Sequence, residues 1–284
     1  MNLDKEIVVP FILNALVEDV GDGDHTSLST IPEGQEGKAK LLIKDSGIIA
    51  GIQVALEIFK IVDPELSTEV LISDGQPVNY GDIAFYVSGS VQSILKAERL
   101  VLNTMQRMSG IASKTNQIVK ILEGTATRVL DTRKTTPGLR YLEKMSVKIG
   151  GGVNHRFGLY DMILIKDNHV DYAGGIIKAI RSAQNYLKVN QINIPVEIEV
   201  RSLQELKQVI EVGGIDRILL DNFEFSMLRE AVDLINGAFI TEASGGITEE
   251  NVLEYALCGV DYVSMGALTH SVRSLDMSLK AVKS

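Results

Sequence analysis

Six short apolar runs between Arg128 and Gly266 each end abruptly in a polar, charged or glycine residue, and helix-like stretches separate most of them. The runs are RVLDTRK, DMILIKD, VEIEV, RILLDN, FITEASGG and DYVSMGA. Continuous apolar runs are typical of strands buried on both faces, and their alternation with helices favours a parallel sheet. Ligands of such sheets bind at the carboxyl ends of the strands. The residues that end the runs are therefore site candidates: Arg133, Lys166, Glu199, Asp221, Ser244 and Gly266.

The pattern predicts an α/β protein with two domains. Six strands rather than eight indicate an open, incomplete α/β barrel, with helices over 141–149, 172–187, 203–212, 225–235 and 249–257. Residues 37–90 show short strands and turns instead, which predicts a separate N-terminal α+β domain. An amphipathic helix is expected over 3–18, a long helix over 92–122, and a helical tail over 275–283 that packs back on the N-terminal domain.

Charge and cysteine content limit the possible partners and compartment. The net charge of −9 argues against a nucleic-acid surface, yet residues 128–169 carry eight Lys or Arg against four acids. This local excess indicates an anion pocket. The single cysteine, Cys258, excludes an internal disulfide framework and is interpreted as a buried structural thiol. No leader-like N-terminus and no apolar run of about 18 residues occurs, so a cytoplasmic protein without a membrane span is expected.

Two glycine turns end the last two runs. Gly245 and Gly246 precede a helix expected to open at Thr248, and Gly266 is followed closely by His270. Glycines let backbone N–H groups approach an anion, and the last two loops of a barrel frequently bind phosphate.

Carboxylates and cations surround these turns. Glu197 and Glu199 alternate in VEIEV and so share one face of their strand. Glu199 and Asp221 could hold Mg²⁺ on a polyphosphate, and the alternative is a structural ion pair with Lys166 or Lys134.

Guanidinium groups gather in one part of the chain. Arg133, Arg140 and Arg156 can make forked contacts with carboxylates or phosphates. The run of glycines at 150–152 could present His155 and Arg156 from a tight loop, whereas His25 is interpreted as structural.

At these residues the chain resembles the quinolinate phosphoribosyltransferases, or nicotinate-nucleotide pyrophosphorylases (carboxylating). The matching motifs are EDVGDGDHTS, ERLVLN, TRKTTPGLR, GGGVNHRFGLYDMILIKDNH, EIEV, LLDNF, EASGG and MGALTHS. The resemblance implies an open barrel of about seven strands (107–271) and an N-terminal α/β sandwich (1–106) joined by the tail 272–284. It further implies Mg²⁺, a homodimer with shared active sites, and formation of nicotinate mononucleotide, pyrophosphate and CO₂ from quinolinate and 5-phosphoribosyl-1-pyrophosphate in NAD biosynthesis.

The resemblance also implies roles for individual residues. The quinolinate site would comprise Arg133, Lys134, His155, Arg156 and Lys166, with Arg99 from the partner subunit. The phosphoribosyl pyrophosphate site would comprise Lys134, Lys166, Glu199, Asp221, Ser244, Gly245, Gly246, Gly266 and His270. Lys134, Lys166, Glu199 and Asp221 would be catalytic, and Glu199 and Asp221 would bind the metal.

Alternatives remain open from the residues alone. One is a related phosphoribosyltransferase with another heterocyclic acceptor, and another is a Schiff-base lyase that uses Lys166 as nucleophile. A non-enzymatic quinolinate-binding protein is a third. A dinucleotide-binding domain is not expected, because no GxGxxG motif follows an early strand.

Overall fold

The computed structural model describes residues 3–282. The chain forms two compact units. The first comprises Met1–Asn116, Thr136–Gly151 and Ser271–Ser284, and the second comprises Gln117–Thr135 and Gly152–His270. These limits differ from the expected domains, 1–106 with 272–284 and 107–271, mainly at 107–116 and 136–151. The expected domain limits stay a prediction.

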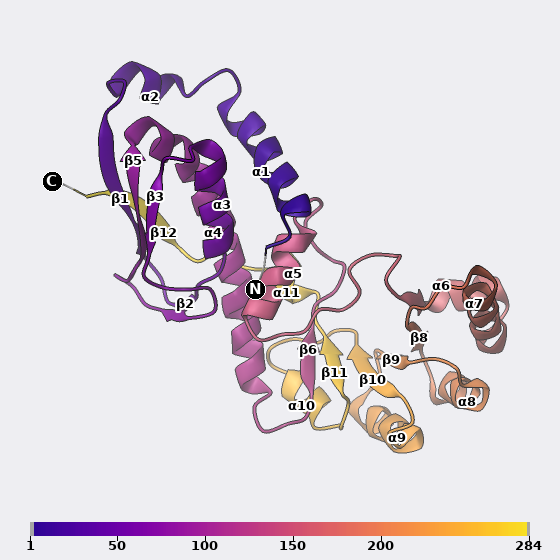
Figure 1. The fold of residues 1–284 in the computed structure, drawn as a ribbon. Coiled ribbons are helices and arrows are strands. Elements are labelled where there is room, and N and C mark those ends of the chain that lie inside the picture. The colour runs from indigo at the N-terminus through magenta and orange to yellow at the C-terminus, as the bar shows by residue number, and fades with distance from the viewer. Residues whose placement is uncertain (1–2, 283–284) are drawn as a thin grey trace. The chain divides into compact units, whose positions relative to one another are not determined.

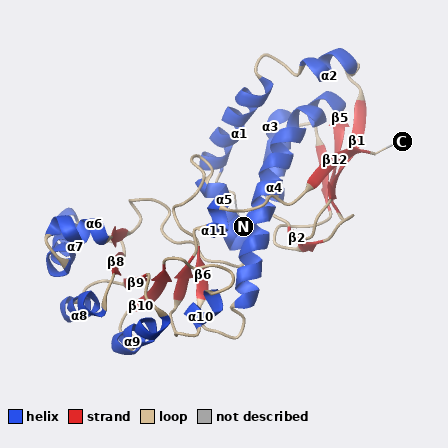
Figure 2. Cartoon of the chain, turned by 180° about the vertical axis from the view of Figure 1, so that it is seen from behind, coloured by secondary structure: helices blue, strands red, loops and turns tan. Residues whose placement is uncertain are grey.

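The first unit contains an antiparallel sheet with strand order β12-β1-β5-β3 (Figures 1 and 2). Its strands are β1 (Glu36–Ile43), β3 (Ser67–Val70), β5 (Ile83–Ser90) and β12 (Met277–Ala281), beside a small pair, β2 (Gly47–Ile48) and β4 (Pro77–Val78). Its helices include α1 (Lys5–Val20), α2 (His25–Thr30), α3 (Ile52–Val62) and α5 (Arg140–Ile149), with most of α4 (Val91–Ile121). Alternate residues of β1 are buried, as expected for a strand with one face on a core. Phe59 of α3 and Phe85 of β5 meet edge to face in that core, with ring centroids 5.7 Å apart.

The tail differs from its expected secondary structure. Residues 277–281 form β12, which pairs antiparallel with β1 from Ala39 opposite Ala281 to Ile43 opposite Met277. The prediction of a helix is therefore wrong, and these residues instead contribute a strand to the N-terminal sheet. Met277 and Leu279 are buried with a period of two, and the edge of β1 supplies the hydrogen-bonding partner. Lys283 lies outside the described residues.

The second unit contains a six-stranded parallel sheet with strand order β6-β11-β10-β9-β8-β7 (Figures 1 and 2). The strands are β6 (Arg128–Leu130), β7 (Ile163–Ile165), β8 (Val196–Val200), β9 (Arg217–Asp221), β10 (Ile240–Ser244) and β11 (Tyr262–Ser264). A single parallel bridge between Leu130 and Val153 adds the beginning of a seventh strand beside β6. β7 and β6 are not paired with each other, so the barrel is open and the predicted fold class is confirmed.

Helices follow most of these strands and pack side by side (Figure 1). They are α6 (Asp167–Ala173), α7 (Ile176–Asn190), α8 (Leu203–Val212), α9 (Phe225–Ile235), α10 (Val252–Ala256) and α11 (Ala267–His270). α8 and α9 have the predicted limits. The helix expected over 172–187 is instead two helices, because Gly174 and Gly175 adopt positive φ between them. α10 begins only at Val252, so the helix expected to open at Thr248 does not start beside the glycine turn.

No helix within residues 3–282 is long and apolar enough to cross a membrane.

Candidate active site

The carboxyl ends of the parallel strands bring the predicted residues of the second unit to one edge of the sheet. The rim comprises Arg133 and Lys134 after β6, Lys166 after β7, Glu199 in β8, Asp221 at the end of β9, Ser244 at the end of β10, and Gly266 after β11. Asp221 and Ser244 are directly opposite each other in the register of β9 and β10. The strands create this grouping because parallel neighbours end on the same side.

Glu199 lies between a cation and a second carboxylate. Lys166 Nζ is 3.9 Å from Glu199 Oε2, and Glu199 is only 9% exposed. Burial raises the pKa of Glu199, the negative charge of Asp221 raises it further, and Lys166 opposes the shift. The half-exposed Lys166 ammonium at this distance neutralises Glu199 incompletely, so Glu199 and Asp221 together can still accept a further cation.

Two guanidinium groups, those of Arg133 and Arg156, repel each other electrostatically. Burial lowers the pKa of Arg156, and the positive charge of Arg133 lowers it further, against attraction from Glu197 and Asp161. Arg156 Nη1 donates to the carbonyl oxygen of Met162 at 3.2 Å, and Arg133 Nε is buried without a hydrogen-bond partner. Two like charges held together in this way are suited to an anion with more than one negative charge.

The two glycine turns are constrained by their neighbours. Gly245 has a φ of +96°, and an added Cβ would collide with the Asn222 side chain. At Gly266 an added Cβ would lie 2.9 Å from Lys134 Cδ and 3.1 Å from the His270 ring, so these two side chains flank the turn. Thr269 Oγ1 donates to the carbonyl oxygen of Lys134 at 2.8 Å and fixes the Lys134 loop against the last turn.

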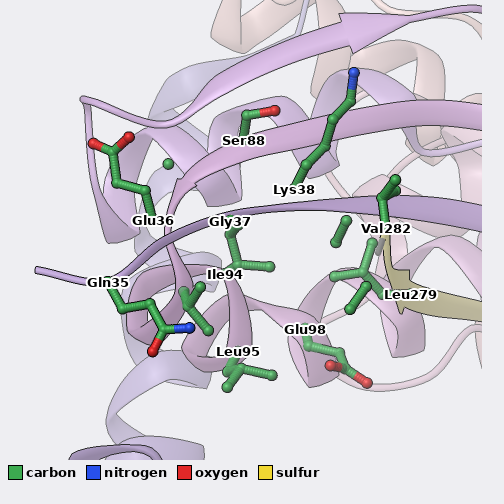
Figure 3. Close-up of a pocket in the computed structure, with 14 residues that line it drawn as sticks. Gln35, Glu36, Gly37, Lys38, Ser88, Ile94, Leu95, Glu98, Leu279 and Val282 are labelled. Atoms are coloured by element: carbon green, nitrogen blue, oxygen red, sulfur yellow. The ribbon is translucent and has the colours of Figure 1, made fainter. Parts of the chain in front are cut away.

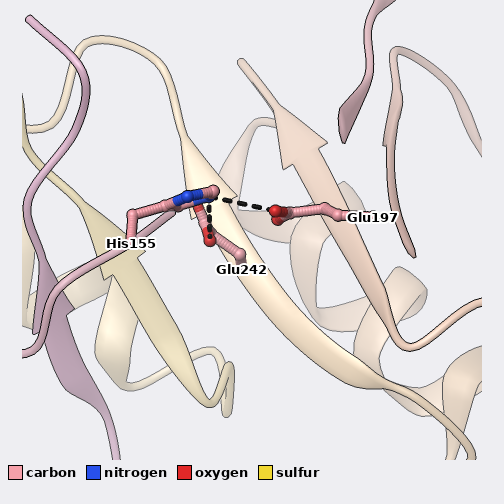
Figure 4. Close-up of side chains that lie close together, drawn as sticks. All are labelled: His155, Glu197 and Glu242. Carbon is pink, nitrogen blue, oxygen red and sulfur yellow. Dashed lines mark ion pairs between the residues drawn. The ribbon is translucent and has the colours of Figure 1, made fainter. Parts of the chain in front are cut away.

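His155 extends into a buried ion-pair cluster rather than toward the rim (Figure 4). Its Nε2 is 3.0 Å from Glu197 Oε2 and 3.4 Å from Glu242 Oε2, and Arg217 Nη1 is 3.0 Å from the same Glu242 oxygen. Burial lowers the pKa of His155, but hydrogen bonds and charges from Glu197 and Glu242 outweigh it and raise the pKa to about 9. Its Nδ1 accepts the backbone N–H of Arg156 at 2.6 Å in the neutral ring protonated on Nε2, and protonation of Nδ1 would break this contact.

The same three side chains have metal-ligating atoms. One such atom from each of His155, Glu197 and Glu242 lies within 4.8 Å of the others. Arg217 already neutralises Glu242, however, and a cation here would have to displace it. We therefore interpret the cluster as an ion-pair network.

Comparison with known proteins identifies the family. The family model described as "Quinolinate phosphoribosyl transferase, C-terminal domain" matches residues 111–280, and the corresponding N-terminal domain model matches residues 24–109. The chain belongs to the quinolinate phosphoribosyl transferase family.

Named members of this family cover nearly the whole chain. Quinolinate phosphoribosyltransferase [decarboxylating] 1b of Nicotiana tabacum is 49% identical over 281 residues, which are 94% of this chain and 80% of the relative. A probable nicotinate-nucleotide pyrophosphorylase [carboxylating] of Bacillus subtilis is 42% identical over 93% of this chain and 89% of its own length. The solved structure of NadC from Streptococcus pyogenes aligns over 100% of both chains with a TM-score of 0.94 and 37% identity.

Some predicted members of the family's site lie outside this rim. Arg99 is exposed on α4 in the first unit, and its predicted contribution to a partner's site stays a prediction. The predicted contact of His155 with a substrate carboxylate likewise stays a prediction. His25 lies at the start of α2, 3.4 Å from Asp22 in an exposed pair. Cys258 is buried and its Sγ is 3.3 Å from the Glu254 carbonyl oxygen, as expected for a structural thiol.

Sequence reasoning did not select Arg217, Glu242, Asp131 or Asn222. A signal for the first two was available, because Arg217 alternates with Asp221 along β9 and Glu242 alternates with Ser244 along β10. The alternation rule that paired Glu197 with Glu199 would have placed both on the inner face. Asp131 Oδ1 accepts the backbone N–H of His155, and the backbone N–H of Asn222 donates to the carbonyl oxygen of Ser244. No sequence pattern reveals contacts of this kind.

A separate cavity in the first unit holds none of the predicted site residues. It has a volume of about 760 Å³ and is lined by strand residues such as Lys38 and by Leu95 and Glu98 of α4 (Figure 3). Its lining includes two acids, Glu36 and Glu98, and one lysine, Lys38, whose Nζ lies 3.6 Å from Glu69 Oε2. This balance disfavours a polyanionic substrate, so we assign the chemistry to the barrel rim.

Proposed function

We propose that this chain transfers the phosphoribosyl group of 5-phosphoribosyl-1-pyrophosphate to the ring nitrogen of quinolinate, with loss of CO₂. The products are nicotinate mononucleotide, pyrophosphate and CO₂, in the NAD biosynthesis pathway. Family membership supports the reaction type. The single structural observation that carries the proposal is the rim at the strand ends, where the parallel sheet places Arg133, Lys166, Glu199 and Asp221 on one side.

The proposed quinolinate site uses the paired guanidinium groups. Arg133 and Arg156 bind the two adjacent carboxylates, because forked N–H donors match carboxylate oxygens. A dianion between them removes the mutual repulsion that lowers the pKa of Arg156. The remaining members of the proposed site are Lys134, His155 and Lys166, with Arg99 of the partner subunit.

The proposed phosphoribosyl pyrophosphate site uses the carboxylates and the turns. Glu199 and Asp221 fit Mg²⁺, since both supply hard oxygen ligands and the negative charge of one raises the pKa of the other. When bound there, Mg²⁺ would neutralise the pyrophosphate leaving group. Ser244, Gly245, Gly246, Gly266 and His270 form the 5′-phosphate region, and Lys134 and Lys166 contact both substrates.

The chemistry needs positioning more than a nucleophilic side chain. The pyridine nitrogen attacks the ribose C1 as the bond to pyrophosphate breaks, and Glu199 and Asp221 stabilise the positive charge that develops on the ribose. The alkylated ring nitrogen is then positive and stabilises the carbanion left when the 2-carboxylate departs as CO₂. The carbanion finally takes up one proton. Exclusion of water from the closed site favours the departure of the 2-carboxylate as CO₂.

The assembly and the compartment belong to the same proposal. A homodimer supplies Arg99 from each subunit to the other's rim, and the protein is placed in the cytoplasm. Equilibrium sedimentation of the wild-type protein and of Arg99→Ala, with activity of mixed subunits, tests the shared site.

One assay tests the reaction. Wild-type protein is incubated with quinolinate, phosphoribosyl pyrophosphate and Mg²⁺, and CO₂ and nicotinate mononucleotide are followed together. Equal release of both is expected, with no CO₂ when nicotinate replaces quinolinate. Product formed from nicotinate in preference to quinolinate would contradict the proposal. Borohydride with a sugar phosphate should leave Lys166 unmodified, because Lys166 is half exposed and close to Glu199 rather than desolvated.

A further inference from the structure

The buried cluster lies beneath the proposed substrate rim. Glu197 is two residues before Glu199 on β8, and Arg217 is four residues before Asp221 on β9. Glu197 and Arg217 are opposite each other in the register of these strands. Glu197 and Glu242 are at most 1% exposed, so neither carboxylate is placed to contact a substrate directly.

His155 connects this cluster to both arginine-bearing loops. The backbone N–H of His155 donates to Asp131 Oδ1 at 2.9 Å, and Asp131 is two residues before Arg133. The backbone N–H of Asp131 donates to the Val153 carbonyl oxygen at 3.1 Å, which ties the two loops together a second time. On the other side, the backbone N–H of Arg156 donates to His155 Nδ1.

The orientation of the imidazole follows from these contacts. Nε2 faces the two carboxylates and Nδ1 faces the Arg156 amide, so the ring plane and the backbone at 155–156 are fixed together (Figure 4). Glu242 is itself held by Arg217, whose guanidinium lies 4.8 Å from the centroid of the Tyr262 ring. The cluster therefore has a rigid base.

We propose that Glu197, Glu242 and Arg217 position His155, and that His155 in turn sets the separation of the Arg133 and Arg156 guanidinium groups. This inference rests on the proposed function. It makes His155 a positioning residue that determines specificity for two adjacent carboxylates on a planar ring. Supporting residues of this kind matter because binding groups must be held within about 0.5 Å of their productive geometry.

The test compares two substitutions at one buried position. Glu197→Gln keeps a polar oxygen beside His155 Nε2, which lies 3.0 Å from Glu197 Oε2, whereas Glu197→Leu removes every acceptor at similar volume. His155→Phe is a second variant that keeps a ring and removes both nitrogens, and Glu230→Gln on the exposed face of α9 is the matched control. Dissociation constants are measured by calorimetry for quinolinate, phosphoribosyl pyrophosphate, benzene-1,2-dicarboxylate and benzoate. The two benzene carboxylates lack the ring nitrogen and report carboxylate recognition alone.

Glu197→Leu and His155→Phe are expected to weaken binding of both dicarboxylates by about 10- to 100-fold, the usual effect of removing a supporting contact. Their preference for benzene-1,2-dicarboxylate over benzoate should fall in both variants, while phosphoribosyl pyrophosphate binding and kcat at saturating quinolinate stay unchanged in Glu197→Leu. Glu197→Gln should remain close to the wild type.

Two results would overturn the inference: wild-type dicarboxylate affinity in Glu197→Leu, or an equal loss for both substrates together with a lower Tm. The latter would indicate a purely structural role. Failure of the proposed function is a different result, because the wild-type protein itself would then release no CO₂ from quinolinate.

Discussion

Replacing Arg133 with methionine should stabilise the ligand-free protein and strongly weaken quinolinate binding. Arg133 Nε is buried without a hydrogen-bond partner, and the charge of Arg133 lowers the pKa of Arg156. A buried unsatisfied donor costs about 1–3 kcal/mol, and methionine keeps the aliphatic stem while removing the donor and the charge. We expect a gain of about 1–2 kcal/mol, which corresponds to a rise in Tm on the order of 2–6 °C for a protein of this size.

The loss in free energy of quinolinate binding should be larger than this gain in free energy of unfolding. Truncating one partner of a buried charged contact typically costs about 2 kcal/mol or more, which is roughly a 30-fold increase in Kd. Quinolinate at about 100 times the wild-type Kd stabilises the wild-type protein by about 2.7 kcal/mol. The same concentration should stabilise Arg133→Met by less than about 1 kcal/mol.

Thermal unfolding with and without quinolinate measures both effects in one experiment. Arg128→Met is the matched control, since Arg128 is exposed at the start of β6 and carries no proposed role. The reasoning is refuted if Arg133→Met unfolds at a lower temperature than the wild type and still shows the full quinolinate shift.

Three further outcomes are expected. Gly266→Ala should lower kcat with little change in Tm, because the added Cβ would lie 2.9 Å from Lys134 Cδ and would displace this flexible side chain. A wild-type kcat in Gly266→Ala would count against the placement of Lys134. Burial raises the pKa of the Cys258 thiol, so iodoacetamide at pH 8 should modify Cys258 slowly in the folded protein and rapidly in urea; equal rates would contradict its burial. Burial and the charge of Asp221 raise the pKa of Glu199, so the folded protein binds a proton at Glu199 at a higher pH than the unfolded chain does. The free energy of unfolding should therefore increase as the pH falls through the folded-state pKa of Glu199. Urea unfolding of the metal-free protein across this range should show that slope in the wild type and lose it in Glu199→Gln.

The sequence predicts those features that depend on residues close together in the chain. Parallel strands buried on both faces leave a continuous apolar run, so β8, β9 and the residues that end them could be predicted directly. Gly213 follows α8 in the way that helix-ending glycines do, and the limits of α8 were correct.

The remaining features depend on partners that are distant in the sequence. Residues 277–281 suit a helix by composition and become a strand only because β1 offers an edge. The cluster of His155, Glu197 and Glu242 requires the register of three elements, which no single segment encodes. His155 was selected for its glycine-rich loop, yet its side chain faces inward because two buried carboxylates attract it.

The position of β12 has a consequence for biosynthesis. The sheet that contains β1 receives its edge strand from residues 277–281, more than 230 residues later in the chain. The first unit therefore cannot be completed until residues 277–281 have left the ribosome, even though most of its residues emerge early. The six strands of the parallel sheet precede β12 in the chain, so they can pair before the sheet beside β1 receives its edge strand.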